Sequence, residues 1–132
     1  MKYLCIDYGL KRIGLAKSDG LLASPIGVLP NHGFRKTILA LKQHIKDNTT
    51  VIMGLPLHAD GTDSDFAPTV REFAKLLAEE AGVPIVFVNE YMTSNMAEHH
   101  IRSTKTKESI DAVAACMILQ SYLDNKGGFP NA

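Results

Sequence analysis

Short apolar runs and longer amphipathic stretches follow one another along this chain, and these two patterns predict strands and helices respectively. The apolar runs predict strands over residues 2–7, 12–18, 26–29, 49–56 and 84–90. Helical spacing predicts helices from Phe34 to residue 47, from residue 66 to a stop at Gly82, over residues 94–102 and over about 109–125. In the last helix, we expect Val113, Met117 and Leu123 to lie on or near a core face.

The order of these elements indicates the fold class. Three strands at short spacing favour an antiparallel meander, whereas strands that flank a helix favour parallel pairing with right-handed crossovers. The sequence therefore predicts an α/β protein with a mixed five-stranded sheet (βββαβαβα), a short extra helix before the last one, and helices on both faces. The 132 residues fit a single domain over 1–132.

Composition narrows the class of protein. A hydrophobic share of 45% with 21% charged residues is that of a folded domain and not of a disordered chain. No stretch approaches the roughly 18 uninterrupted apolar residues of a membrane span, and the first apolar run is too short for a signal peptide. We expect a soluble, cytoplasmic protein without a membrane partner. Cys5 and Cys116 lie in separate apolar runs without metal-ligand spacing, which predicts two buried free thiols.

Charge is balanced overall but uneven along the chain. The 14 basic and 14 acidic residues give a formal net charge of zero, whereas nucleic-acid-binding proteins often carry a basic excess. Positive charge gathers in the first hairpin, with Lys11 and Arg12, and in the stretch before the last helix, with Arg102, Lys105 and Lys107. A net charge of zero is therefore compatible with a basic region on one face of the protein.

Three carboxylates follow or begin predicted elements at one edge of the sheet. Asp7 ends the first strand, Glu90 ends the last strand, and Asp111 opens the final helix. Ligands of open α/β sheets bind beyond the carboxyl ends of the strands, so Asp7 and Glu90 face one crevice if the first and last strands are neighbours. Converging carboxylates repel one another unless a cation neutralises them, and oxygen ligands favour Mg²⁺ or Mn²⁺. Up to two such ions would suit phosphodiester hydrolysis.

Each carboxylate also has a purely structural interpretation. Asp7 could cap the turn through the backbone N–H groups of Gly9 or Leu10. Glu90 could be an exposed strand end, and Asp111 could be placed favourably in the dipole of its helix.

Four sequence blocks carry a resemblance to a known family. DYGLKRIGLA, GLPLHADGT, NEYMTS and DAVAACMILQSYL are similar, in this order, to the motifs of the YqgF family of ribonuclease H-like proteins, over residues 3 to about 124. The family is associated with Holliday junction resolution and with nuclease processing of pre-16S rRNA. The resemblance implies a ribonuclease H-like fold. It also implies that Asp7, Glu90 and Asp111 are catalytic acids that bind Mg²⁺ or Mn²⁺.

Three positions depart from the family pattern. His58 stands where the second block usually has Asn, and Asn89 and Tyr91 flank Glu90 where the family usually has Asp and Arg. An arginine pairs with phosphate in a planar fork that a tyrosine does not reproduce, although a tyrosine can stack on a base. These changes concern substrate affinity more than metal binding.

Several further residues have both a functional and a structural interpretation. Basic residues could contact nucleic-acid phosphates, or simply lie in solvated loops; these are Lys11, Arg12, Arg102, Lys105 and Lys107. Gly9 and Gly14 are expected to permit turn geometry. The GLPLHADGT loop could approach a phosphate, or serve as a helix entry with Asp63 or Ser64 as N-cap. His99 and His100 could transfer protons or be surface residues of a helix.

The favoured function is a metal-dependent endonuclease that acts on structured nucleic acid. The resemblance implies processing of the 5′ end of pre-16S rRNA, on ribosome precursor particles, with structured RNA preferred to junction DNA as the partner. The alternatives are a Holliday junction resolvase-like DNA nuclease, a nucleotide-binding domain like those of actin-like kinases, and a non-catalytic interaction module. We expect a monomer or a weak homodimer.

Overall fold

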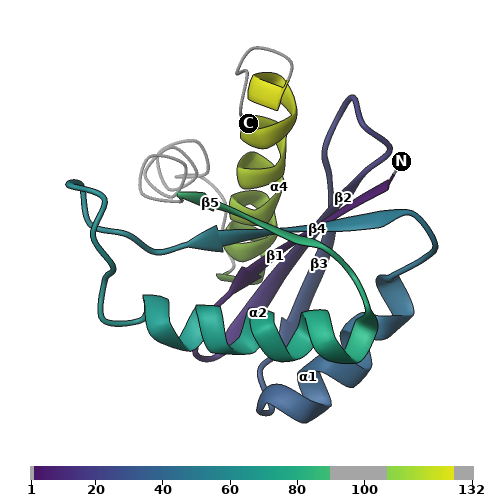
Figure 1. Cartoon of the computed structure of the whole chain (residues 1–132). Helices are drawn as coiled ribbons and strands as arrows, with labels where there is room; N and C mark the ends of the chain where they lie inside the picture. The colour runs from purple at the N-terminus through teal and green to yellow at the C-terminus, as the bar shows by residue number, and fades with distance from the viewer. Residues whose placement is uncertain (1, 90–106, 127–132) are drawn as a thin grey trace.

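A five-stranded mixed sheet in the order β3-β2-β1-β4-β5 forms the centre of the molecule (Figure 1). The computed structural model describes residues 2–89 and 107–126. The strands are β1 Lys2–Tyr8, β2 Arg12–Ser18, β3 Ser24–Pro30, β4 Thr49–Leu55 and β5 Ile85–Asn89. The helices are α1 Phe34–Leu41, the 3-10 turn η1 Lys42–His44, α2 Ala67–Ala81 and α4 Lys107–Lys126. All five predicted strands are confirmed, with ends within two residues of the predicted ones.

Strand pairing corrects one expectation about the sheet. The first three strands form the predicted antiparallel meander, and β4 pairs in parallel with both β1 and β5. Because β4 lies between β1 and β5, the first and last strands are not neighbours. The reason is the apolar run Val51–Met53, whose side chains are fully buried and so require helices on both faces of their strand.

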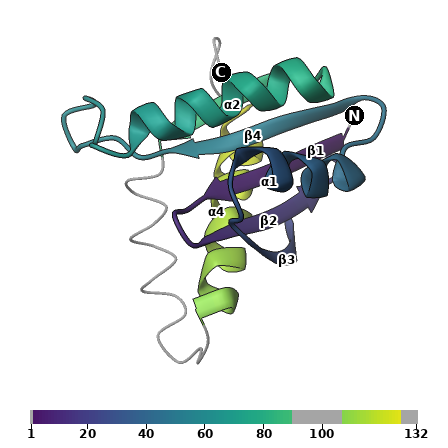
Figure 2. The same cartoon turned by 90° about the horizontal axis from the view of Figure 1, so that it is seen from below.

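The two faces of the sheet are covered by different helices (Figure 2). α1 and α2 lie on one face, where Leu4, Ile6 and Tyr8 of β1 pack against residues such as Ile38 and Phe73. α4 lies on the other face, where Tyr3 and Cys5 of β1 pack against residues such as Ile118. This alternation along β1 is the period of two expected for a strand buried on both faces. The predicted helices on both faces are therefore confirmed.

Several helix details differ from the predictions. The first helix ends at Leu41 and not at residue 47, because the chain tightens into η1 and then turns extended at Ile45 to enter β4. The residue before α2 is Phe66, with no side-chain cap, so neither Asp63 nor Ser64 is the N-cap. Gly82 ends α2 in the left-handed conformation, with φ of 65°, as predicted. The predicted helix over 94–102 lies outside the described residues.

The buried face of α4 is also shifted from the predicted one. Ala112, Ala114, Ala115, Ile118 and Leu119 are buried, whereas Val113 and Met117 are only half-buried. Leu123 packs at the margin of the core. Small residues let the helix lie close to the sheet, and this outweighs the periodic placement of larger side chains.

Both cysteines are free thiols, as predicted, but only Cys5 is buried. Cys116 is half-buried, and this partial burial raises the pKa of its thiol. None of the helices within residues 2–89 and 107–126 is long and apolar enough to span a membrane.

Candidate functional site

Asp7 lies near the carboxyl end of β1, on the face of the sheet that α4 covers. It follows Tyr3 and Cys5 at a spacing of two residues, and both of these pack against α4. Asp7 is half-buried and stands opposite Gly14 of β2 in the antiparallel register. A side chain at the position opposite would stand beside the carboxylate, and glycine leaves that place open.

The backbone of α4 lies directly over Gly14. A Cβ atom built on Gly14 would overlap the carbonyl oxygen of Asp111 and would lie 2.7 Å from its carbonyl carbon. Gly14 is inside β2 and not in a turn, so the expectation that it permits turn geometry is wrong. Its role is to let the helix approach the sheet closely, which brings Asp111 over the strand position opposite Asp7.

Arg12 forms an ion pair with Asp111 at the same place. The distance from Arg12 Nε to Asp111 Oδ2 is 2.8 Å, and the two side chains are 30% and 29% exposed. Arg12 is two residues before Gly14 in β2, so its side chain lies on the same face of the sheet as Asp7. The sequence predicts phosphate contact or a solvated loop for Arg12, and metal binding or a favourable place in the helix dipole for Asp111. No pattern in it indicates that the two are partners.

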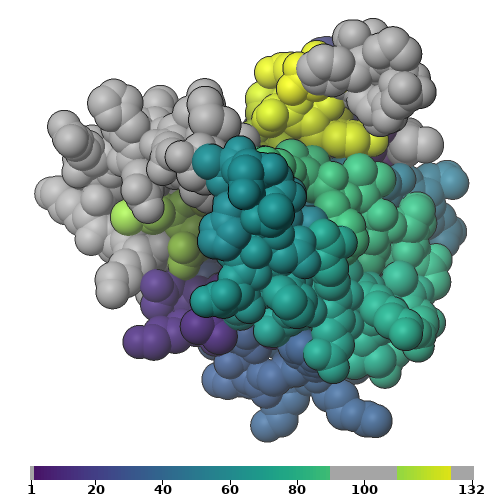
Figure 3. Space-filling view, turned by 60° about the vertical axis from the view of Figure 1, so that its left-hand side comes forward, coloured from purple at the N-terminus to yellow at the C-terminus, as the bar shows by residue number. Residues whose placement is uncertain are grey.

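Three segments gather on the face of the molecule where this site lies. In the space-filling view, the purple β1–β2 turn, the yellow-green start of α4 and the teal loop after β4 lie close together (Figure 3). Two carboxylates, Asp7 and Asp111, lie with the guanidinium group of Arg12 on one face of the sheet, near the carboxyl end of β1. Oxygen donors of this type fit a hard divalent cation such as Mg²⁺ or Mn²⁺.

The described part of the chain supplies only part of such a site. Within residues 2–89 and 107–126, no group of three His, Cys, Asp or Glu side chains is placed to hold a metal ion. Glu90, the third predicted acid, lies outside the described residues and directly follows β5 in the sequence. Arg102 and Lys105 also lie outside them, together with Tyr91, His99 and His100. Lys107 begins α4, and its side chain is not among those described.

The β1–β2 turn presents Lys11 and is held by a residue that sequence reasoning missed. Lys11 is exposed. The side-chain amide of Asn31 donates to the carbonyl of Gly9 over 2.8 Å, and the backbone N–H of Asn31 donates to the carbonyl of Lys11 over 2.9 Å. Asn31 therefore fixes both sides of the turn. The only signal in the sequence is its place between Pro30 and Gly33, which is typical of a turn.

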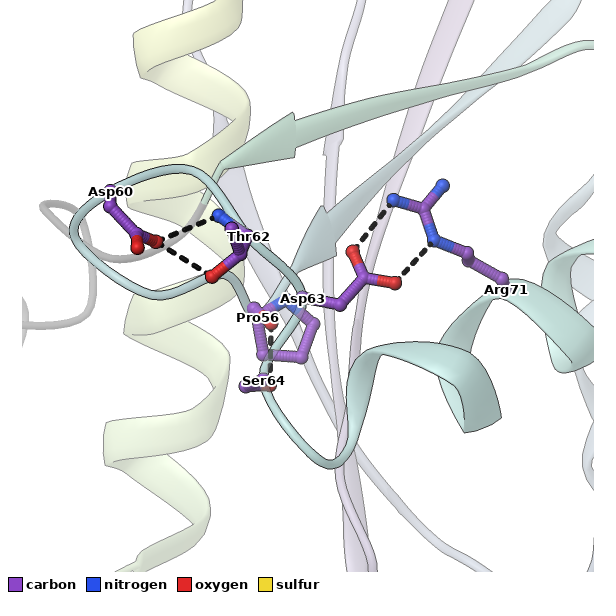
Figure 4. A network of polar contacts seen from close by, with 6 residues as sticks. All are labelled: Pro56, Asp60, Thr62, Asp63, Ser64 and Arg71. Atoms are coloured by element: carbon purple, nitrogen blue, oxygen red, sulfur yellow. Dashed lines mark hydrogen bonds and ion pairs between the residues drawn. The ribbon is translucent and has the colours of Figure 1, made fainter.

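The loop between β4 and α2 is closed by its own polar side chains (Figure 4). Asp60 accepts hydrogen bonds from the hydroxyl of Thr62 over 2.6 Å and from its backbone N–H over 3.0 Å. The hydroxyl of Ser64 donates to the carbonyl of Pro56. The bonds from Thr62 lower the pKa of Asp60. His58, which departs from the family pattern, is exposed, and its backbone N–H donates to the carbonyl of Thr62.

Arg71 of α2 ties this loop to the rest of the fold. It donates to both carboxylate oxygens of Asp63, over 2.9 and 3.3 Å, and its guanidinium group lies 5.8 Å from the centre of the Phe87 ring in β5. This pairing lowers the pKa of Asp63 and raises the pKa of Arg71. Asp63 is thus a partner of α2 through its side chain, although it does not cap the helix.

Comparison with known proteins places the chain in a family. The family model described as "RuvX: Holliday junction resolvase" matches residues 1–125. The chain belongs to the RuvX family. RuvX is another name for the YqgF family, so the resemblance of the four sequence blocks is confirmed. The match covers β1, the loop after β4, and the part of α4 that bears Asp111.

Similar curated proteins agree with this membership. A protein of Synechococcus sp. (strain JA-2-3B'a(2-13)) is 36% identical over 93% of this chain and 78% of its own length. One of Endomicrobium trichonymphae is 37% identical over 90% of this chain and 92% of its own. Both carry the name "Putative pre-16S rRNA nuclease".

Similar solved structures confirm the ribonuclease H-like fold. RuvC of Thermus thermophilus superposes with a TM-score of 0.58 at 13% identity, over 96% of this chain and 97% of RuvC. RuvC in complex with a Holliday junction substrate gives a TM-score of 0.59 at 16% identity, over 97% of this chain and 96% of RuvC. At this low identity the likeness concerns the fold.

Proposed function

We propose that this protein is a metal-dependent endonuclease that hydrolyses phosphodiester bonds in structured RNA, and that its substrate is the 5′ end of pre-16S rRNA. The observation that carries the proposal is that Gly14 lies opposite Asp7 and directly under the backbone of Asp111, which puts both acids on one face of the sheet. Two carboxylates on one face at a strand end repel each other unless a positive charge neutralises them, and a bound metal ion would supply that charge. Membership in the RuvX family and the names of its relatives support nuclease chemistry on nucleic acid.

Asp7, Asp111 and Glu90 would hold the metal. When bound there, Mg²⁺ or Mn²⁺ would supply activation of a water molecule and stabilisation of the leaving oxygen of a phosphodiester. The chain's own part is to fix the acids: Asp7 is held by strand pairing, and Asp111 by the backbone contact with Gly14. With a metal ion on Asp111, Arg12 would be free to contact a phosphate of the substrate beside the exposed Lys11.

A four-way DNA junction is the second candidate substrate. The description of the family and the fold shared with RuvC favour it. Cleavage of either substrate would use the same acids. Balanced net charge gives no preference for RNA or for DNA.

A cleavage assay with a matched variant tests the proposal. Purified protein with Mg²⁺ or Mn²⁺ is offered a pre-16S rRNA fragment and a four-way DNA junction, beside Asp7→Asn and the control Asp47→Asn. Asp47 is an exposed carboxylate in the loop before β4. Asp7→Asn is expected to slow cleavage by about a hundredfold or more, which corresponds to roughly 3 kcal/mol of lost transition-state stabilisation.

Each result has a distinct meaning. Asp47→Asn should cleave like the unaltered chain, and faster cleavage of the junction would assign the DNA substrate. Asp7→Asn cleaving at the rate of the unaltered chain would remove Asp7 from the site. A folded protein that cleaves neither substrate would favour a non-catalytic interaction module.

A further inference from the structure

A cavity of about 780 Å³ opens at the end of the sheet remote from Asp7. Its walls come from the start of β1, the end of β2, the β2–β3 loop and the segment after α1. Lys2 lines the cavity whereas Asp7 lies at the other end of the same strand, and a strand of this length spans about 20 Å. The β2–β3 loop stands out from the fold at this end, near the N-terminus (Figure 1). The cavity is therefore separate from the proposed nuclease site.

Two leucines of the β2–β3 loop line the cavity and face solvent. Leu21 is 77% exposed and Leu22 is 70% exposed. Exposing two adjacent leucines forgoes the roughly 1.5–3 kcal/mol that burial of each side chain would contribute. Clusters of this kind on a folded domain mark interaction sites more often than scattered single residues do.

The loop is held in this shape by α4. The side-chain oxygen of Gln120 accepts from the backbone N–H of Ala23 over 2.8 Å, and its nitrogen donates to the carbonyl of Leu21 over 3.3 Å. The backbone N–H of Gly20 donates to the hydroxyl of Ser18 over 2.9 Å. Bonds on both sides of Leu22 keep the loop from folding inward. A site prepared in this way loses little conformational entropy when a partner binds.

Positive charge surrounds these leucines. Lys2, Lys17 and Lys46 line the cavity with His44, against one lining carboxylate, Asp19. This excess stands out on a chain whose formal net charge is zero. The complementary ligand carries carboxylates beside apolar side chains.

We propose that this surface docks an acidic, amphipathic segment of a partner protein. Single-stranded nucleic acid is the less suitable occupant, because its bases bind through aromatic stacking and arginine, and the residues that line this cavity include no arginine and no exposed Phe, Tyr or Trp. Leucines and lysines fit a peptide whose apolar side chains enter the cavity while its carboxylates pair with the rim. The proposal goes beyond the nuclease function and does not depend on it.

Selection of peptides on the full-length chain tests the proposal. A phage-displayed library of random linear peptides is selected on the unaltered protein, with subtraction against the double variant Lys17→Glu/Leu21→Ser. Selected peptides are then synthesised, and their affinities are measured for both proteins and for the control Lys75→Glu/Leu39→Ser. The control changes one lysine and one leucine that are equally exposed but do not line the cavity; Leu39 is 68% exposed.

We expect the peptides that remain after subtraction to combine acidic and apolar residues. Their affinity should fall by about tenfold or more in Lys17→Glu/Leu21→Ser and stay unchanged in the control. Gln120→Ala, which releases the loop without altering a lining residue, should weaken the same peptides. Thermal unfolding checks that every variant is folded.

Four outcomes would overturn the proposal. The first is the absence of enrichment over the subtracted variant, and the second is enrichment of peptides without acidic residues. The third is that the double variant weakens binding of a duplex RNA, which would assign the surface to nucleic acid. The fourth is self-association of the unaltered chain that the double variant abolishes, which would make a second copy of the chain the occupant.

Discussion

Arg12 and Asp111, which are 99 positions apart in the sequence, form an ion pair of 2.8 Å near the carboxyl end of β1, where Asp7 lies. The guanidinium group supplies the positive charge that two neighbouring carboxylates require. Within the proposed site, a divalent cation and Arg12 compete for the same carboxylate. This competition leads to the first prediction.

Arg12→Ala should strengthen metal binding and lower the free energy of unfolding of the metal-free protein. The ion pair is partly exposed, so we expect a loss of about 0.5–1 kcal/mol in the absence of metal. The rise in melting temperature on addition of Mg²⁺ should be larger than in the unaltered chain, because Asp111 no longer has to leave a partner. Thermal unfolding with and without Mg²⁺ measures both effects. Arg35→Ala, at an exposed position of α1, is the control. An equal Mg²⁺-dependent shift in both variants would contradict the competition.

Gly14→Ala should displace α4 from the sheet. The added methyl group overlaps the backbone of Asp111, and overpacking of this kind costs about 1–3 kcal/mol. Cleavage should fall with stability, because Asp111 moves away from Asp7. Gly27→Ala is the control: its Cβ meets nothing within 4 Å, although its φ of 151° makes a side chain strained there. The control should lose stability without losing cleavage by the folded fraction. Cleavage that is retained in Gly14→Ala would show that the close approach is not needed.

Lys11→Ala should reduce the salt dependence of RNA binding. If Lys11 contacts one phosphate, the slope of log K against log salt should fall by about 0.7–0.9. Filter binding or fluorescence anisotropy over a range of salt concentrations gives the slope. Lys75→Ala, at an exposed position of α2, should leave it unchanged. An identical slope in Lys11→Ala would place the nucleic-acid face elsewhere.

Arg71→Gln should remove a stabilising interaction that depends on pH. The hydrogen bond from Arg71 lowers the pKa of Asp63 below the ordinary value of 3.8. A lowered carboxyl pKa contributes stability above the value in the unfolded chain, and this contribution is lost as the pH falls through the folded value. The variant should therefore be less stable than the unaltered chain at neutral pH and equally stable at an acid pH where Asp63 is protonated in the folded chain as well. Urea unfolding at both pH values measures the difference. A deficit of the same size in acid would point to lost packing on Phe87 instead.

The sequence by itself determined the elements and most of their order. Short continuous apolar runs bounded by turn residues, such as those of β1 and β4, favour strands buried on both faces, and residues such as Gly82 end helices for local reasons. The same local chemistry placed Asp7 at a strand end and suggested a divalent cation. The four motif blocks also indicated the family, since a motif is read along the chain.

Only the tertiary structure decided which residues meet. The position of β4 between β1 and β5 depends on the burial of both its faces, and the close approach of α4 to Gly14 depends on backbone atoms of Asp111. The pairing of Arg12 with Asp111 and the bonds of Gln120 to the β2–β3 loop likewise join residues about a hundred positions apart. Such contacts arise from the packing of helices on a sheet. No local pattern in the sequence predicts these contacts. Each residue fits the strand, helix or loop in which it lies, whether or not its distant partner is near.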